Sequence, residues 1–300
     1  MNSKTKTQFI EYFIKGIKKP EQLKIGVEHE RFLFEGKNKK RITYKKLKQL
    51  FENLKKKGWV SILEKKNVVG LKRGKQQITT EPGLQCELSG APLENIHQVC
   101  SESSNYLKEI KEASSGLDIN TASVGFDPFN KLASLPINPK ERYKIMTNEM
   151  PKSGELSLEM MYRTCGIQIN YDYTSEVNFE KIFRLGNYLV PLTIALYANS
   201  PFENGKPTGY QSYRNKIWQK TSRSGIMPIV FEKLTFEKYF DHAINYPILF
   251  ATRDKNYIQP NGQIFKDFIE GKFKNINGEA NLKDFETHLA TIFTEVRLKQ

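Results

Sequence analysis

Two short acidic stretches carry the residues most suited to chemistry. Glu28 and Glu30 are two positions apart in a β-branched and aromatic run over 25–34. Such a run predicts a strand, in which both carboxylates point to the same face. Neighbouring like charges on a sheet repel each other, and a cation between them would remove that repulsion. Glu81 and Glu87 add two carboxylates around a Pro-Gly turn. Oxygen ligands with few thiols or imidazoles nearby favour a hard cation such as Mg²⁺ over zinc.

The alternative interpretation of the Glu28–Glu30 pair is a solvated sheet face, which is the commoner role of such a pattern. The apolar neighbours Phe32, Phe34 and Leu88 favour a partly covered strand instead. Both interpretations stay open on the pattern alone. His29 lies between the two carboxylates and therefore points to the opposite face, so we assign it no metal role.

A second strand pattern, over 163–172, has a face of uncharged polar side chains that includes Gln168 and Asn170. Amide groups suit a cleft that needs directional hydrogen bonds or neutral metal ligands. An exposed sheet face is the alternative. Further along, Arg214 lies in a segment rich in Gly and Pro, where site loops are common. Its planar guanidinium could hold a carboxylate, although a surface ion pair is the more usual role of a single Arg.

These residues need a sheet to position them, and the pattern of the chain predicts an α+β fold built on an antiparallel sheet. No dinucleotide-binding glycine motif and no P-loop is present. Strands are expected near 25–35, 58–63, 67–71, 76–81, 85–89, 120–126 and 163–172. Helices are expected near 5–18, 44–57, from Pro92 onward, and near 178–198, 235–245, 263–270 and 282–293.

The composition is that of a folded globular protein. The chain has 300 residues, of which 38% are hydrophobic and 12% aromatic. The cysteines Cys86, Cys100 and Cys165 follow no metal spacing, and we expect three buried, inert thiols in a reducing compartment. No stretch is apolar enough to span a membrane, and the N-terminus has no secretory signal pattern. These features predict a cytoplasmic protein without a membrane partner.

The formal charge of +14 is concentrated at one end of the chain. Residues 1–80 contain 22 Lys and Arg against 7 Asp and Glu. A basic region could bind nucleic acid or an anionic cosubstrate. Most of these charges, however, are lysines on helical faces, such as the six lysines in a predicted helix over 44–57, opposite apolar residues. A solvated helix face is the preferred interpretation, and we expect no nucleic-acid partner.

Six motifs in register resemble one known family. They cover 27–32, 81–94, 142–146, 160–170, 198–202 and 214–218. Together they resemble the plant and alphaproteobacterial type of glutamate–cysteine ligase, within the glutamine-synthetase-like carboxylate–amine ligases. The resemblance implies a curved antiparallel sheet with flanking helices, with metals and nucleotide in its bowl. It also implies that ATP phosphorylates the γ-carboxylate of glutamate, and that the amine of cysteine then displaces phosphate. This is the first step of glutathione biosynthesis.

The resemblance also implies roles for individual residues. Glu28, Glu30, Glu81 and Glu87 match the acidic metal ligands of the family. Gln168 and Asn170 match the strand that lines the site, Gln168 as a substrate-binding residue and Asn170 as a catalytic one. Arg214 matches an arginine that holds glutamate, and Arg163 falls in a matched motif as a further catalytic candidate. Mg²⁺ is the implied cofactor, and ATP, glutamate and cysteine are the implied small-molecule partners.

Some features depart from the family pattern. Cys86 stands where an aromatic residue is expected, and Lys216 stands at a position that bears on recognition of cysteine. Members of the family are longer, so we expect residues 1–300 to form one catalytic domain of about two thirds of the usual length, C-terminally incomplete. The segment 295–300 resembles the lead-in to a further strand with another glutamate and arginine. We therefore expect weak or no activity from 300 residues alone.

Two other functions remain as alternatives. One is a related carboxylate–amine ligase with a different amine acceptor. The other is a truncated homologue without catalytic activity that acts as a binding protein. The sequence is compatible with a monomer or a homodimer.

Overall fold

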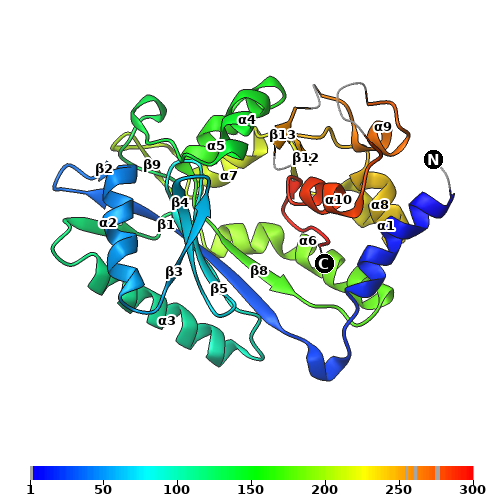
Figure 1. The fold of residues 1–300 in the computed structure, drawn as a ribbon, viewed down its shortest axis with the longest axis horizontal. Coiled ribbons are helices and arrows are strands. Elements are labelled where there is room, and N and C mark those ends of the chain that lie inside the picture. The colour runs from blue at the N-terminus through cyan, green and yellow to red at the C-terminus, as the bar shows by residue number, and fades with distance from the viewer. Residues whose placement is uncertain (1–2, 254–255, 260–261, 274–277, 300) are drawn as a thin grey trace.

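The computed structural model describes residues 3–253, 256–259, 262–273 and 278–299. An eight-stranded sheet stands between two long helices on one side and a helical region on the other (Figure 1). The N-terminal helix and the C-terminal end of the chain both lie in that helical region. The fold is therefore α+β with a large antiparallel sheet and flanking helices, as the sequence predicts.

The sheet has the strand order β2-β1-β6-β5-β4-β3. Strands β7 and β8 lie outside this order, and each of them pairs with β1. All of these pairings are antiparallel. The strands are β1 (Ile25–Glu35), β2 (Lys40–Arg41), β3 (Val60–Glu64), β4 (Asn67–Arg73), β5 (Gln76–Thr80), β6 (Cys86–Ser89), β7 (Ile119–Ala122) and β8 (Ile167–Tyr171). The predicted strand 25–35 coincides with β1, because its β-branched and aromatic residues show no competing helical period.

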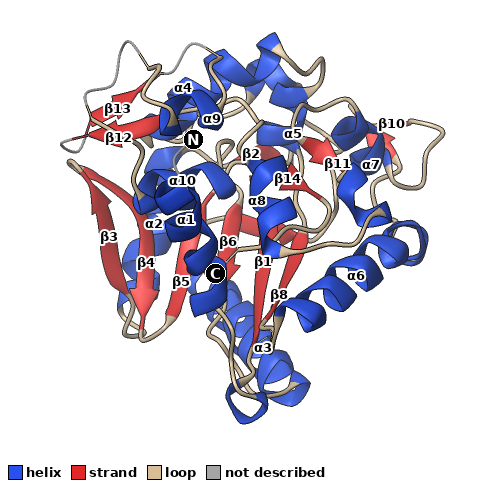
Figure 2. Ribbon diagram, turned by 90° about the vertical axis from the view of Figure 1, so that its right-hand side faces the viewer, coloured by secondary structure: helices blue, strands red, loops and turns tan. Residues whose placement is uncertain are grey.

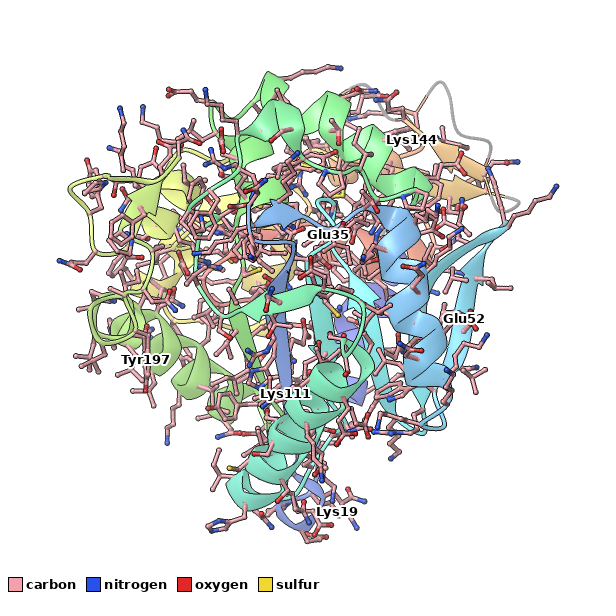
Figure 3. All side chains as sticks on the ribbon, turned by 90° about the vertical axis from the view of Figure 1, so that its left-hand side faces the viewer. Lys19, Glu35, Glu52, Lys111, Lys144 and Tyr197 are labelled. Atoms are coloured by element: carbon pink, nitrogen blue, oxygen red, sulfur yellow. The ribbon has the colours of Figure 1, made fainter. Side chains whose placement is uncertain are left out.

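Alternation along the strands gives the sheet one apolar and one polar face. Leu33, Ile78 and Leu88 point to the apolar face and are fully buried. They pack against α2 (Tyr44–Lys55) and α3 (Ile96–Ala113), whose apolar sides complete this core. Figure 3, which views the molecule from this side, shows both helices in front of the sheet. The opposite face of the sheet is therefore free to carry the polar residues.

The two covering helices begin at capping residues. Thr43 accepts a hydrogen bond from the backbone of Lys46, and Asn95 accepts one from Gln98. The expectation that Pro92 opens α3 is wrong, since the cap lies at Asn95 and the helix begins at Ile96. Cys100 is exposed on α3, whereas Cys86 and Cys165 are buried. The expectation of three buried thiols is therefore wrong for Cys100, which lies on the solvent side of the helix.

The helical region has an aromatic core. Phe9, Phe13, Phe179, Phe240 and Phe285 are buried there and contact one another or shared neighbours edge to face and in stacks. These residues come from α1 (Ser3–Lys15), α6 (Glu176–Leu196), α8 (Phe236–Ala243) and α10 (Leu282–Leu289), and α9 (Phe265–Ile269) adds more. This core holds the helical region opposite the polar face of the sheet.

Three short helices near the top of the sheet in Figure 1 were not predicted. They are α4 (Glu141–Glu149), α5 (Ser157–Arg163) and α7 (Tyr213–Gln219). They share a core rich in methionine and aromatic residues. The remaining strands are short: β9 (Phe202–Glu203), β10 (Lys206–Pro207), β11 (Ser224–Gly225), β12 (Ala251–Arg253), β13 (Asn256–Ile258) and β14 (Phe293–Thr294). No helix in the described residues is long and apolar enough to cross a membrane.

Candidate active site

A cavity of about 1000 Å³ lies over the polar face of the sheet. In Figure 2 this face is seen behind α1, α8 and α10, which belong to the helical region that encloses it. The side chains of Glu28, Glu30, Glu81 and Glu87 all line the cavity. The structure thus brings the four predicted metal ligands to one cavity.

Strand register explains why these carboxylates meet. Glu30 on β1 lies directly opposite Glu87 on β6, and Glu28 lies opposite Gln168 on β8. Residues paired in an antiparallel ladder point to the same face of the sheet. Glu81 follows β5, in a turn closed by a hydrogen bond of 2.9 Å from the Leu84 amide to the Glu81 carbonyl. His29 points to the other face, where its Nε2 lies 2.9 Å from the Ser103 hydroxyl.

Each carboxylate is held by donors from the protein. The Gly166 amide donates to Glu30 Oε2 at 2.7 Å, and the Ser89 hydroxyl donates to Glu87 Oε1 at 2.5 Å. Glu28 Oε1 accepts from Gln168 Nε2 at 2.8 Å and from Asn170 Nδ2 at 3.0 Å. The fourth carboxylate, Glu81, lies 3.3 and 3.4 Å from the Tyr143 hydroxyl. These contacts fix the orientation of the acidic groups.

The local electrostatics favour an added positive charge. Removal from water and repulsion from Glu81 raise the pKa of Glu30 and of Glu87 well above the ordinary range. Both carboxyls would ionise more readily with a cation between them. The donors are all oxygen atoms, which fits Mg²⁺. No three acidic, imidazole or thiol groups in the described part of the chain already form a metal-ligand cluster. A bound cation would therefore have to draw the carboxylates closer together.

Cationic side chains line the same cavity. They are Arg142, Arg214, Lys283, Arg297 and Lys299. None of the five has a carboxylate within ion-pair distance among the residues that the structure describes. Withdrawal from water and, to a smaller extent, repulsion from Arg297 lower the pKa of Lys299. A cavity with acidic groups on its floor and several cations without acidic partners suits a ligand that carries both anionic groups and a bound metal.

Arg214 reaches the cavity from α7. Its Nε donates to the Cys165 carbonyl at 2.8 Å, and its guanidinium lies over the Trp218 ring at 5.1 Å. It also lies close enough to Glu30 to favour the ionised form of that carboxyl. These contacts anchor one edge of the guanidinium against the protein. The predicted role as a carboxylate clamp remains a prediction that this placement supports.

Two predicted residues are placed differently from the rest. Asn170 does not line the cavity, and it reaches the site only through Glu28 and Gln168. Arg163 is almost fully buried, does not line the cavity, and pairs with Glu159 and Glu203 at 2.9 and 3.0 Å. Its guanidinium also packs on the Phe126 ring. These contacts tie α5 to β9, so the geometry gives Arg163 a structural role and does not support direct catalysis.

Several cavity residues escaped the sequence analysis as site residues. Arg142 and Tyr143 lie within one of the family motifs, and no spacing in the sequence marks them individually as site residues. Residues Glu295, Arg297 and Lys299 also line the cavity. The alternate spacing of these three charged residues is the sequence signal for a shared face.

The cavity also has an apolar end. Met146, Met160, Trp218, Phe250 and Phe293 line it there. Such a surface suits the aliphatic part of a small substrate. Lys216 lies elsewhere, with its Nζ over the Tyr210 ring at 5.6 Å, and does not line the cavity. The departure noted at position 216 is therefore not at the cavity wall.

Comparison with known proteins identifies similar chains. Residues 24–300 match the family described as Glutamate-cysteine ligase family 2. Glutamate–cysteine ligase A, chloroplastic, of Oryza sativa subsp. japonica is 45% identical over 99% of this chain and 61% of the rice protein. The chloroplastic glutamate–cysteine ligases of Nicotiana tabacum and Arabidopsis thaliana are 44% and 42% identical, each over 99% of this chain and 58% of the relative. The chain thus spans about three fifths of the length of these relatives.

The names of these relatives overturn one expectation. All three are chloroplastic proteins, so the expectation of a cytoplasmic location is wrong. That expectation rests on the absence of a targeting pattern from residues 1–300. This absence says nothing about residues outside that range.

Proposed function

The chain belongs to glutamate–cysteine ligase family 2, and from this we propose that it carries out, or carries the main site for, ATP-dependent ligation of the γ-carboxylate of glutamate to the amine of cysteine. The observation that carries the proposal is the cavity, in which four carboxylates face several cations that have no acidic partners. The reaction brings a nucleoside triphosphate and a dicarboxylic amino acid together. Cationic side chains are needed to hold their anionic groups, and carboxylates are needed to hold the metal ion that accompanies the phosphates.

The four carboxylates would hold Mg²⁺. A bound magnesium ion neutralises phosphate charge and orients the transferring phosphoryl group. Glu30 and Glu87 are the strongest candidates as ligands, since they face each other across β1 and β6 with raised pKa values. Glu28 and Glu81 flank them on the same floor. Gln168 and Asn170 orient Glu28 by hydrogen bonds.

The cations would hold the anionic substrates. Arg214 is proposed to bind a carboxylate of glutamate, because its fork lies beside the apolar end of the cavity and its Nε is already anchored to a carbonyl. Arg297 and Lys299, which line the same cavity, are proposed to bind phosphates of ATP. Arg297 Nη2 donates to Gln168 Oε1 at 2.8 Å, which holds its guanidinium at the edge of the acidic floor.

Catalysis on this scheme depends on position and charge. The γ-carboxylate of glutamate attacks the terminal phosphorus of ATP, the bond to the bridging oxygen breaks, and ADP leaves with γ-glutamyl phosphate formed. The neutral amine of cysteine then attacks the acyl carbon, phosphate leaves, and the nitrogen gives up a proton to form the amide. No protein nucleophile is needed for either step. The pocket residues supply orientation and charge neutralisation, which account for most of the rate in phosphoryl transfer.

We also propose a location and a domain organisation for the chain, both by analogy with its relatives. The chloroplastic names of the relatives support a plastid location. Residues 1–300 are proposed to act as one catalytic unit, because the cavity draws its walls from β1, β6 and β8 and also from α7, α10 and the segment 293–299.

The test is an assay of ADP formation with glutamate and each candidate amine in turn, with products identified by mass. We expect γ-glutamylcysteine, at a low rate for residues 1–300 alone, with ADP formation that needs glutamate and a divalent cation. Glu87→Gln should abolish this activity, and Glu35→Gln, on the same sheet but outside the cavity, should not. A product with another amine would identify a different ligase. Failure to bind ATP and glutamate in calorimetry would contradict the proposal altogether.

A further inference from the structure

Glu81 reaches the acidic floor from a turn, whereas Glu28, Glu30 and Glu87 lie on strands of the sheet. The turn joins β5 to β6. Within it, Leu84 has a positive φ of 59°, a backbone conformation that residues other than glycine seldom adopt. Such a conformation persists only where the surrounding structure holds it. The position of the Glu81 carboxylate therefore depends on the contacts that fix this turn.

Asn138 holds the start of the turn from outside. It lies in the segment that leads into α4, and it is fully buried. Its Nδ2 donates to the Thr80 carbonyl at 2.9 Å, to the Thr80 hydroxyl at 2.8 Å and to the Glu81 carbonyl at 3.0 Å. The Asn138 backbone amide donates to the Pro82 carbonyl at 2.9 Å. One buried residue thus bonds to three consecutive residues of the turn, with Glu81 in the middle.

The Thr80 carbonyl has more donors around it than it can accept from. Besides Asn138, Lys140 Nζ donates to it at 2.9 Å, and the Tyr143 hydroxyl lies 3.1 Å from it. A carbonyl oxygen has two lone pairs, and Asn138 and Lys140 are the two closer donors. The single proton of the Tyr143 hydroxyl is therefore left for Glu81, whose carboxylate oxygens lie 3.3 and 3.4 Å from it.

From these contacts we propose that Asn138 is a positioning residue for cation binding, an inference that rests on the proposed role of Glu81 as a metal ligand. Asn138 does not line the cavity, so it acts only through other residues. Its bonds to residues 80–82 fix the backbone from which Glu81 projects. Because it occupies the Thr80 carbonyl, it also directs the Tyr143 hydroxyl to the Glu81 carboxylate. Without Asn138, Tyr143 would donate to the Thr80 carbonyl, and Glu81 would lose its oriented contact.

The test is a titration of the 300-residue chain with Mn²⁺ in the presence of ATP, in which electron paramagnetic resonance measures the protein-bound ion. The variants are Asn138→Leu, which keeps nearly the volume of the side chain, and Asn138→Ala, which adds no bulk. Both remove the Nδ2 donor. We expect the dissociation constant for Mn²⁺ to rise about tenfold in each, the usual effect of losing a group that orients a metal ligand.

A double variant and a matched control separate positioning from general stability. Asn138→Leu combined with Tyr143→Phe should weaken Mn²⁺ binding by much less than the product of the two separate losses, because Asn138 acts partly through Tyr143. The control is Asn53→Leu. Asn53 Nδ2 also donates to a backbone carbonyl, that of Ala113 at 2.9 Å, but this bond ties α2 to α3 on the other face of the sheet. Urea denaturation should show a loss of stability in Asn53→Leu, while its affinity for Mn²⁺ stays unchanged.

The outcomes distinguish this inference from the proposed function. If the unchanged chain and the folded Asn138 variants bind Mn²⁺ equally well, the inference is overturned and the proposed function stands. The inference is also overturned if the two losses multiply in the double variant, or if Asn53→Leu weakens Mn²⁺ binding as much as Asn138→Leu. If circular dichroism shows that neither Asn138 variant folds, Asn138 serves the fold as a whole and the narrower role is wrong. If the unchanged chain binds no Mn²⁺, the acidic floor is not a cation site, and the proposed function fails together with the inference.

Discussion

Gln168 lies between Glu28 and Arg297 and hydrogen-bonds to both. Its Nε2 donates to Glu28 Oε1 at 2.8 Å, and its Oε1 accepts from Arg297 Nη2 at 2.8 Å. The amide thereby lies between the carboxylate of Glu28 and the guanidinium of Arg297, and we expect these two groups to form an ion pair without it. Glu28 stays available to a cation, and Arg297 stays available to an anion.

Replacement of this amide tests that separation. In Gln168→Leu we expect Arg297 to pair directly with Glu28, so that affinity falls both for divalent cations and for ATP. Calorimetry with each ligand measures the two effects. Asn170→Ala is the matched control, because Asn170 contacts Glu28 and Gln168 but not Arg297. It should weaken cation binding alone. Equal effects of both variants on ATP would show that Gln168 does not separate the two charges.

Tyr143 is expected to position Glu81. The Tyr143 hydroxyl accepts from Arg142 Nη2 at 3.1 Å and lies within 3.4 Å of both Glu81 oxygens. Tyr143→Phe should therefore reduce cation affinity by about tenfold, the usual effect of losing a group that orients a metal ligand. Tyr162→Phe is the control, since that hydroxyl bonds to Thr147 in the same core. Similar losses in both variants would indicate a general packing effect.

Arg214 is expected to bind glutamate. Arg214→Ala should raise the KM for glutamate much more than the KM for ATP, since one charge-assisted contact contributes about 1.5–3 kcal/mol. Steady-state kinetics with each substrate varied in turn provides the measurement. Arg184→Ala, which breaks a surface pair with Glu180, should change neither value. A parallel rise in both KM values would remove Arg214 from the glutamate site.

His288 should make stability depend on pH. Its ring is buried, stacks on Phe265 and bonds through Nε2 to the Ala243 carbonyl at 2.8 Å. Burial and repulsion from Arg223 lower the pKa of His288 to about 3. The unfolded chain, with an ordinary pKa of about 6.5, binds a proton first as the pH falls. The contribution of the neutral ring is therefore complete above about pH 6.5 and is lost progressively toward pH 3.

The comparison with His288→Gln isolates this effect. The variant should be less stable at pH 7, but its free energy of unfolding should fall less steeply between pH 6.5 and 5, by up to about 1.4 kcal/mol per pH unit. Urea denaturation at several pH values provides both slopes. Identical slopes would show that His288 is not the group responsible.

The sequence predicted the acidic floor well because local pattern determines it. Glu28 and Glu30 alternate along a strand that has no competing period, and β1 has the predicted bounds. The family resemblance is confirmed by the match over residues 24–300. The positions of Glu81 and Glu87 followed from a turn and a strand that are also local.

The cationic side chains that line the cavity are predicted less well from the sequence, because tertiary packing brings them together. Arg214 is predicted as a candidate from its loop and from the family resemblance, but Arg142 and Lys283 come from segments far apart in the chain and have no local pattern that marks them as site residues. The short helices α4, α5 and α7 were missed for a related reason, since their packing against a shared core stabilises them more than their own sequence does. Strand β8 begins at Ile167 and not at 163, because α5 includes residues up to Arg163.

The central claim is that the acidic floor binds a divalent cation, and titration with Mn²⁺ followed by electron paramagnetic resonance tests it most directly. We predict saturable binding to the unchanged chain in the presence of ATP, lost in the double variant Glu28→Gln and Glu87→Gln. Binding should persist in Glu35→Gln, whose carboxylate lies on β1 outside the cavity and pairs with Lys46 at 3.1 Å. Equal Mn²⁺ binding by the double variant and the unchanged chain would contradict the claim.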